Sequence, residues 1–394
     1  MVALLKNKAW LFNKVFCVNN HNIQLPTSAS RLLKPLADLF MHLRGQTIAI
    51  GLSAGADSAM LSVCAASLAK QYHIHLHCLY IHHGLVASAD EWQQRCKELV
   101  KQLNQLFFAT DLNQSAVVFA TLAVQVDKHS GLGIEGAARE ARYQAFFNYA
   151  QQHQIEHFLL AHHLNDQAET LLLRLLRGSG TRGMQGMQAK SWRGTQANDG
   201  IYKRATSAEF PVAQMRVCFY RPWLMLEREH ILDLAHWFEQ QTQWIPVQDE
   251  SNFDERYKRG VIRQYLNPVL HRFWPSWRQN LARHARLMQE AQQVMDDMAT
   301  VDFQCLEVQD QSHSFSLKAW RALPTYRQSN VLRYWLGLFN IAMPSDKRLQ
   351  AWLKQLREVH QLGFDREVLL PHESYIIRVK RGRVILEKPS QRNL

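Results

Sequence analysis

The sequence lacks several features that define other classes of protein. In its 394 residues, no apolar run approaches the roughly 18 residues that a membrane-spanning helix requires. Its six cysteines include no C-x-x-C pair, which argues against a zinc ribbon. They are also scattered along the chain, as is typical of reduced thiols rather than of a disulfide framework. We therefore expect a cytoplasmic protein.

Acidic residues are scarce relative to basic ones. Asp and Glu number 34 against 46 Lys and Arg, and the net charge is +12. This balance favours a polyanionic partner, nucleic acid before a membrane surface, and leaves the fold open. The first acid is Asp38. Because the preceding segment has no uninterrupted apolar run and no small-residue cleavage site, we interpret residues 1–30 as an extension rather than a targeting signal.

The first half of the chain alternates short apolar runs with amphipathic stretches, the pattern of β-α units around a parallel sheet. Strands are predicted at 47–52, 73–81, 106–110 and 157–161. Helices are predicted between and after them at 57–70, 90–103, 134–151 and 166–176. Residues 178–220 are rich in Gly, Ser, Thr, Gln and basic residues, and we interpret them as a long loop.

Beyond Arg221-Pro222 the pattern becomes helical. Helices are predicted at 227–240, 259–266, 277–298, 326–338 and 345–359. The tail predicts a hairpin of strands 375–380 and 384–388 around Arg381-Gly382. The expected organisation is an extension (1–30), an α/β catalytic domain (31–226), a helical region (227–310) and a C-terminal α+β region (311–394).

One segment has the pattern of a phosphate-binding loop. A strand at 48–52 leads through the small residues Ser53, Ala54, Gly55 and Ala56 into a helix that begins at Asp57 and Ser58. Small side chains let backbone N–H groups approach an anion, and the helix dipole favours negative charge. No G-K-[ST] follows, so the loop is not a Walker loop.

Asp57 beside a bound phosphate would be repelled unless a cation lay between them, which indicates Mg²⁺. An ordinary strand-to-helix turn, with Ser53 or Asp57 as the N-cap, is the alternative interpretation of the same segment.

A second polar segment, which contains His162, His163, Asp166 and Glu169, follows the strand predicted at 157–161. Ligands of open α/β sheets bind beyond the carboxyl ends of the strands, so this segment should lie at the same edge as the phosphate-binding loop. A capping box is also expected here, with Asp166 as the N-cap and Glu169 three residues later. Because a cap does not explain the two histidines, we assign a functional role to Asp166 and leave Glu169 open.

A basic stretch runs from Arg256 to Gln289, with eight Lys or Arg and no acid. Five aromatic residues are interleaved with these cations: Tyr257, Tyr265, Phe273, Trp274 and Trp277. Cations that pair with phosphates and aromatic faces that stack on unpaired bases suit single-stranded or loop RNA. A charged, solvated helix face is the alternative.

These motifs resemble, in order along the chain, those of the tRNA(Ile)-lysidine synthetase family of PP-loop ATPases. Residues 53–58 resemble the S-G-G-x-D-S pyrophosphate loop. Further matches follow at 82–85 (HHGL), 140–143 (EARY), 162–170 (HHLNDQAET), 177–180 (RGSG), 221–222 (RP), 249–254 (DESNFD) and 259–263 (RGVIR). The resemblance covers about residues 45–265, with weaker similarity beyond. Ala54 departs from a loop glycine of the family and Gly260 from a usual asparagine, and the further small domain of long members is not expected.

The resemblance implies a parallel-sheet, Rossmann-like PP-loop domain of the adenine nucleotide alpha hydrolase-like type, followed by a mainly helical domain. It implies an enzyme that adenylates the C2 oxygen of the wobble cytidine in tRNA(Ile) with a CAU anticodon, releasing pyrophosphate. Free L-lysine then displaces AMP, which leaves lysidine. ATP, Mg²⁺, lysine and that tRNA are the expected partners.

The resemblance also assigns roles to residues. Residues 53–58 would hold the pyrophosphate, and Asp57 would place Mg²⁺. Arg142 would offset charge on the adenylate. Asp166, with His162, would bind or deprotonate the lysine amine, which is a poor nucleophile at neutral pH. The expected tRNA contacts are Arg221, Arg256, Arg259 and Arg263.

Two rivals remain. A tRNA cytidine thiolase would be expected to need paired cysteines or an iron–sulfur cluster, and the sequence has no C-x-x-C. A basic RNA-binding protein with a decayed ATP site, marked by Ala54, is the rival from another class. Such a protein would not be expected to keep Ser53, Asp57, Asp166 and Glu169 together.

Overall fold

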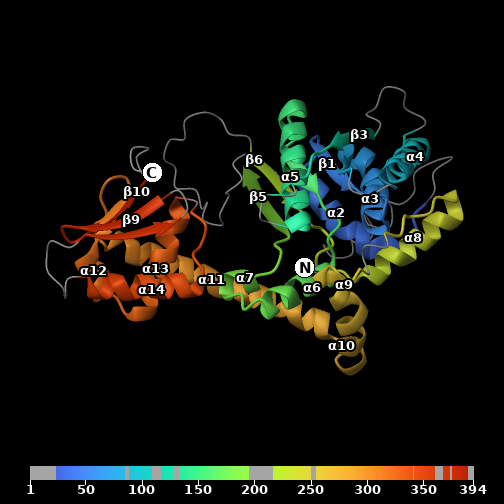
Figure 1. The fold of residues 1–394 in the computed structure, drawn as a ribbon. Helices are drawn as coiled ribbons and strands as arrows, with labels where there is room; N and C mark the ends of the chain where they lie inside the picture. The colour runs from blue at the N-terminus through green and yellow to red at the C-terminus, as the bar shows by residue number, and fades with distance from the viewer. Residues whose placement is uncertain are drawn as a thin grey trace, which may run out of the picture. The chain divides into compact units, whose positions relative to one another are not determined.

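The computed structural model consists of two units, each with its own core (Figure 1). The first comprises Met1–Thr195 and Ala213–Arg286, and the second Gln196–Val212 and Leu287–Leu394. The structure describes residues 24–84, 88–108, 117–127, 129, 133–194, 216–249, 254–339, 341–359, 367–372 and 375–388. No helix within these ranges is long and apolar enough to cross a membrane.

A six-stranded sheet with the order β3-β2-β1-β4-β6-β5 lies at the centre of the first unit. All neighbouring strands are parallel except β5, which pairs antiparallel with β6 at the edge. The strands are β1 (Thr47–Leu52), β2 (His75–His82), β3 (Val118–Ala123), β4 (His157–Leu159), β5 (Lys190–Gly194) and β6 (Arg216–Tyr220). This arrangement confirms the predicted α/β fold class.

Helices cover both faces of the sheet, as the apolar character of its central strands requires. Alternate residues of β1 point to opposite faces, so Ile48 and Ile50 join one core cluster while Ala49 joins another. The first cluster takes residues from η1 (Thr27–Ala29), α2 (Ser30–His42), α3 (Ala56–Tyr72), α4 (Ala89–Phe107) and α8 (Arg228–Thr242). The cluster on the other face of the sheet takes residues from α5 (Gly133–His153).

Two sequence-based predictions in this unit are wrong. The strand predicted at 106–110 begins with residues that end α4, since the helical period of Leu99 and Leu103 continues through them; residues 109–110 lie outside the described residues. The strand in this part of the sheet is β3. The loop predicted at 178–220 contains α7 (Thr181–Met184), β5 and β6, while 195–215 lie outside the described residues. Polar residues on the edge strand β5 hide its strand pattern.

Leu25 and Ala29 are buried in the core of the first unit, so the chain packs against the fold before the predicted boundary at residue 30. Residues 1–23, the larger part of the predicted extension, lie outside the described residues.

The second unit combines helices with a four-stranded antiparallel sheet of order β7-β10-β9-β8. Its elements are the end of α11 (Trp277–Gln304), β7 (Ser314–Ser316), α12 (Leu317–Ala322), α13 (Thr325–Leu338), α14 (Asp346–Glu358), β8 (Val368–His372), β9 (Tyr375–Lys380) and β10 (Arg383–Glu387). The predicted hairpin forms, with Arg381 and Gly382 both at positive φ, as a two-residue hairpin turn requires.

The division between the units falls at Arg286/Leu287, inside α11. The boundaries predicted from the sequence are 226/227 and 310/311. The structure differs because α8 packs against α3 and α2 and supplies buried residues to the first core, whereas Phe303 and Leu306 belong to the second core.

Candidate active site

The phosphate-binding pattern forms a hydroxyl-lined turn between β1 and α3. The backbone N–H of Ser53 donates to Ser58 Oγ at 3.0 Å, and the two hydroxyl oxygens are 3.1 Å apart. Gly55 is the N-cap of α3, and no side chain caps this helix end. The alternative in which Ser53 or Asp57 serves as the N-cap is therefore wrong. A helix N-terminus without a side-chain cap suits an anion, because its first N–H groups have no partner within the helix.

Ala54 occupies the strained position of this turn. Its φ is 60°, in the left-handed region, and its methyl group is fully buried. Its carbonyl accepts a hydrogen bond from the Val247 N–H at 3.0 Å, which holds the peptide in place. A left-handed conformation costs a non-glycine residue about 1–2 kcal/mol. The departure from the family's glycine thus falls at the position where glycine would remove strain.

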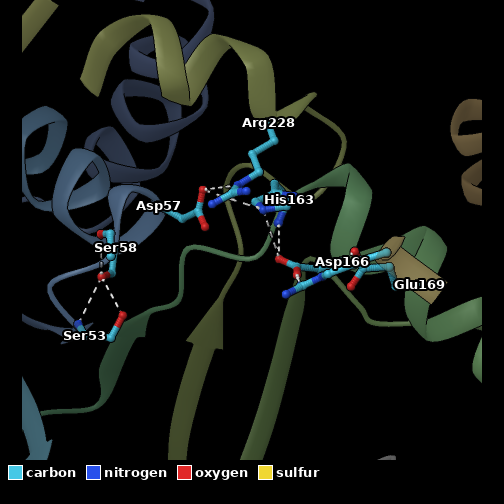
Figure 2. Close-up of polar contacts among 9 residues, drawn as sticks. Ser53, Asp57, Ser58, His163, Asp166, Glu169 and Arg228 are labelled. Carbon is cyan, nitrogen blue, oxygen red and sulfur yellow. Dashed lines mark hydrogen bonds and ion pairs between the residues drawn. The ribbon is translucent and has the colours of Figure 1, made fainter. Parts of the chain in front are cut away.

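Asp57, in the first turn of α3, contacts an arginine and a histidine. Its Oδ1 accepts a hydrogen bond from Arg228 Nε at 3.0 Å and lies 3.7 Å from His163 Nε2 (Figure 2). Burial by itself raises the pKa of Asp57, but the hydrogen bond and charge of His163, together with Arg228, outweigh it and lower the pKa to about 2. Asp57 is therefore ionised at neutral pH.

His163 links Asp57 to Asp166 at the start of α6 (Leu164–Leu176). His163 Nε2 lies 3.5 Å from Asp166 Oδ2, and the His163 backbone N–H donates to the same oxygen at 3.1 Å. Figure 2 shows the imidazole between the two carboxylates. His163 is the N-cap, and Asp166 reaches back to it from the third position of the helix. The predicted cap, with Asp166 as N-cap and Glu169 as its partner, is wrong by three residues.

Glu169 faces a cation instead of a cap. Arg263 Nε donates to Glu169 Oε1 at 2.8 Å, and Arg263 Nη2 lies 3.6 Å from Asp166 Oδ1. Glu169 is only 3% exposed, and its Oε2 has no hydrogen-bond partner among the described residues. A nearly buried carboxylate oxygen without a donor indicates a place for a further cation or N–H group.

Arg259 and Arg263 come from one short segment, α9 (Lys258–Val261) followed by the π-helical turn η3 (Ile262–Leu266). Arg259 Nη2 donates to Thr170 Oγ1 at 3.2 Å, and Arg259 Nη1 lies 3.7 Å from Glu135 Oε1. Both arginines are thus directed at side chains of the first unit. Between them, an added Cβ at Gly260 would overlap the carbonyl oxygen of Asp254, so close backbone packing explains the glycine at this position.

The other residues predicted from the sequence are placed differently. Burial lowers the pKa of His162 to about 3 against the opposing charge of Asp166, so this histidine is neutral, whereas His163 lies 3.7 Å from Asp57 and 3.5 Å from Asp166. Arg221 is 4% exposed and donates to the Gln188 carbonyl at 2.8 Å. Arg256 is paired with Asp254 on the surface.

Arg142 belongs to a cationic cluster around Tyr143 on α5. Burial raises the pKa of Tyr143, but the charges of Arg139, Arg193, Arg221 and Arg142 outweigh it and lower the pKa. The Arg193 guanidinium carbon lies 4.1 Å from the centroid of the Tyr143 ring. This concentration of positive charge is suited to phosphate groups.

Two residues of the site were not selected from the sequence. His163 stands in the H-H motif beside His162, and sequence spacing alone does not say which ring turns toward Asp57. Arg228 has no motif around it, because its contact with Asp57 depends on the packing of α8 against α3.

Comparison with known proteins fits this geometry. A family model described as a PP-loop domain matches residues 25–270, which include the sheet, the loop at 53–58 and the carboxylates of α6. The fold and the site therefore define a protein of the PP-loop class. A second model, described as a TilS substrate binding domain, matches residues 315–385 in the second unit.

Curated relatives narrow the class. Proteins named tRNA(Ile)-lysidine synthase from Bordetella parapertussis and Bordetella pertussis are 42% identical over 340 residues, 86% of this chain and 89% and 95% of theirs. One from Burkholderia mallei is 34% identical over 86% of this chain and 60% of its own. This chain belongs to the tRNA(Ile)-lysidine synthase family, which confirms the resemblance noted in its motifs. Among solved structures, the U34-tRNA thiolase NcsA of Methanococcus maripaludis matches 66% of this chain and 78% of its own, with 12% identity and a TM-score of 0.47.

Proposed function

We propose that this protein uses ATP to join free L-lysine to C2 of the wobble cytidine in tRNA(Ile) with a CAU anticodon, forming lysidine. Membership in the family supports the reaction. The observation that carries the proposal within the chain is the position of Asp57, Asp166 and Glu169, linked by His163 and Arg263 beside a phosphate-binding loop. The loop at 53–58 suits pyrophosphate, and the carboxylates of Asp166 and Glu169 suit an amine.

The loop at 53–58 and the N-terminus of α3 would bind the phosphates of ATP through backbone N–H groups and serine hydroxyls. Asp57 fits a magnesium ligand, because its carboxylate is ionised and adjoins the loop. No three His, Cys, Asp or Glu side chains in the described ranges could hold a metal ion together, so a bound Mg²⁺ would complete its shell with phosphate and water oxygens. That ion would neutralise charge on the phosphates.

In the first step, the cytosine O2 would attack the α-phosphorus of ATP, and the bond to pyrophosphate would break. Arg142 and the cationic cluster around Tyr143 would offset the negative charge on the phosphate of the adenylate. Placing donors where negative charge develops is a large part of catalysis of this kind.

In the second step, the lysine amine would attack C2, and the C2–O bond to AMP would break. Asp166 and the unpartnered oxygen of Glu169 would bind the amine. The amine must first lose a proton, since its ordinary pKa is about 10.4. We assign the histidine of this step to His163, because its ring lies 3.5 Å from Asp166 and holds that carboxylate in place, and Asp166 would accept the proton.

We further propose a cytoplasmic location. Cys64, Cys78, Cys96 and Cys218 are buried and unpaired, and burial raises the pKa of each thiol, which keeps them protonated and unreactive.

The test is a mass assay of the wobble nucleoside with purified protein, Mg-ATP, isotopically labelled lysine and a CAU-anticodon tRNA(Ile) transcript. We expect a lysine mass on that nucleoside, with AMP and pyrophosphate released. Asp57→Ala should abolish AMP formation and leave tRNA binding nearly intact. If AMP forms but lysine is not transferred, the adenylation step is supported and lysine is not the amine donor. If neither product forms although the tRNA binds, the protein is an RNA-binding protein with a decayed ATP site.

A further inference from the structure

A short helix, α10 (Asn267–Phe273), exposes large apolar side chains on the surface of the first unit. Tyr265 just before it, Val269 and Phe273 within it, and Trp274 just after it are 54%, 49%, 61% and 61% exposed. No residue of α10, all of which are described, is buried. The helix lies at the margin of its unit in Figure 1 and packs mainly on the preceding turn η3. We call residues 265–274 the aromatic arm.

The charges around the aromatic arm identify the kind of partner. The stretch from Arg256 to Gln289 contains eight Lys or Arg and no acid, although three of them, Arg256, Arg259 and Arg263, pair with carboxylates from outside the stretch. Glu255, just before the stretch, accepts a hydrogen bond from the Tyr265 hydroxyl. The Arg272 guanidinium lies 5.3 Å from the centroid of the Phe273 ring, and the Phe273 and Trp274 rings are 6.0 Å apart. A second copy of the chain would bring the same positive charge and be repelled. Exposed aromatic faces beside cations match unpaired nucleotides.

The aromatic arm continues directly from the candidate active site. Arg263, which contacts Glu169, stands two residues before Tyr265 in the turn that leads into α10. At a rise of about 1.5 Å per residue, the distance from Arg263 to Phe273 along the helical path is roughly 15 Å, or a few nucleotides of RNA. RNA with its reacting base near Asp166 would therefore pass beside the aromatic arm.

We propose that the aromatic arm binds unpaired bases that neighbour the reacting nucleotide, by stacking on Phe273 and Trp274 while Arg272 contacts a phosphate. The identity of the RNA rests on the proposed function, but the binding of a single-stranded loop does not.

The experiment measures the Kd of the full-length protein for an anticodon stem–loop RNA with a CAU loop, by fluorescence anisotropy over a series of salt concentrations. Phe273→Ala with Trp274→Ala should raise Kd at least about tenfold, with the salt dependence unchanged. Phe273→Tyr with Trp274→Tyr should restore binding, since aromatic faces remain. Arg272→Gln should lower the slope of log Kd against log salt by about one. Met41→Ala removes an apolar side chain that is 61% exposed on α2, away from the arm and from the candidate active site, and should have no effect.

The proposal is overturned if the double alanine variant binds the stem–loop like the wild type. It is also overturned if that variant changes only the sedimentation mass, because the arm would then be a self-association face. Lysidine formation is measured separately on the wild type. A wild type that binds RNA through the arm but makes no lysidine would confirm the arm and reject the proposed function.

Discussion

Ala54 combines two opposing contributions to stability at a single residue. Its left-handed φ of 60° is unfavourable for alanine, whereas its buried methyl group is favourable by roughly 0.8 kcal/mol. We predict that Ala54→Gly changes the free energy of unfolding by less than about 1 kcal/mol, because relief of strain offsets the lost methyl contact. Ala54→Val should destabilise by more than about 2 kcal/mol, since a β-branched residue tolerates positive φ poorly.

Urea unfolding of both variants measures these changes. A loss of more than about 2 kcal/mol in Ala54→Gly would contradict the prediction, because packing of the methyl group would then outweigh the backbone strain.

Asp57 links stability to pH. Its pKa falls from an ordinary 3.8 to about 2 in the folded protein, so its ionised form contributes stability that is fully present above about pH 5. This contribution, about 2 kcal/mol, should disappear as the pH falls through 4 toward 2. Asp57→Asn should therefore be less stable than the wild type at pH 7, and the difference should shrink as the pH falls.

Urea unfolding at several pH values between 7 and 3 provides the comparison for Asp57. A difference that stays constant over this range would show that the carboxylate charge is not its source.

For single residues, the sequence predicted which side chains belong to the site better than it predicted which side chains they contact. The loop serines and Asp57 form the expected turn because neighbours in sequence are neighbours in space. His163, the neighbour of the predicted His162, is the ring within 4 Å of both Asp57 and Asp166, because ring direction depends on the backbone angles of the β4–α6 connection. Arg228 could not be found from spacing, since it reaches Asp57 from a helix more than 170 residues away.

Among the elements, α6 and η3 are joined through the Glu169–Arg263 pair. Removing either partner leaves a charge that is nearly or partly buried, so Arg263→Gln should destabilise the protein by about 3–5 kcal/mol. The double variant Glu169→Gln with Arg263→Gln should lose less than the sum of the single variants, with a coupling of about 1–3 kcal/mol.

The same variants separate a structural arginine from an RNA contact. Arg263 is expected from the sequence to contact tRNA, but its guanidinium pairs with Glu169 and Asp166. We therefore predict that Arg263→Gln leaves the salt dependence of stem–loop binding unchanged, unlike Arg272→Gln. Additive losses of stability would show that the ion pair does not couple the two elements.

Elements with a clear period were the most predictable. The strand at 47–52 and the strand at 375–380 match their predicted bounds. The antiparallel pair β5–β6 was not predicted, because Lys190, Ser191 and Arg193 give β5 no apolar alternation. In addition, β6 is separated from β5 by a long connection in the sequence. The π-helical form of η3 has no signal in the sequence.

For the whole molecule, two units with separate cores imply two unfolding events. The first unit contains the phosphate-binding loop and the sheet, with a core cluster on each face, and the core of the second unit is built around Phe315, Trp320 and Trp335. Mg-ATP at about 100 times its Kd should stabilise the first unit by about 2.7 kcal/mol. We predict that the transition of the first unit moves up by several degrees, while that of the second stays in place.

Differential scanning calorimetry with and without Mg-ATP resolves the two transitions. Asp57→Asn serves as the matched control and should reduce the shift. Equal movement of both transitions in the wild type would contradict independent unfolding of the units.

The bond from the His163 amide to Asp166 gives the site a built-in reporter. Asp166 accepts the His163 N–H at the start of α6, and it is also proposed to bind the substrate amine. The amine and the backbone N–H therefore compete for the same carboxylate. The rate at which the His163 amide proton exchanges with deuterated solvent should therefore record the arrival of lysine, before any chemical bond has changed.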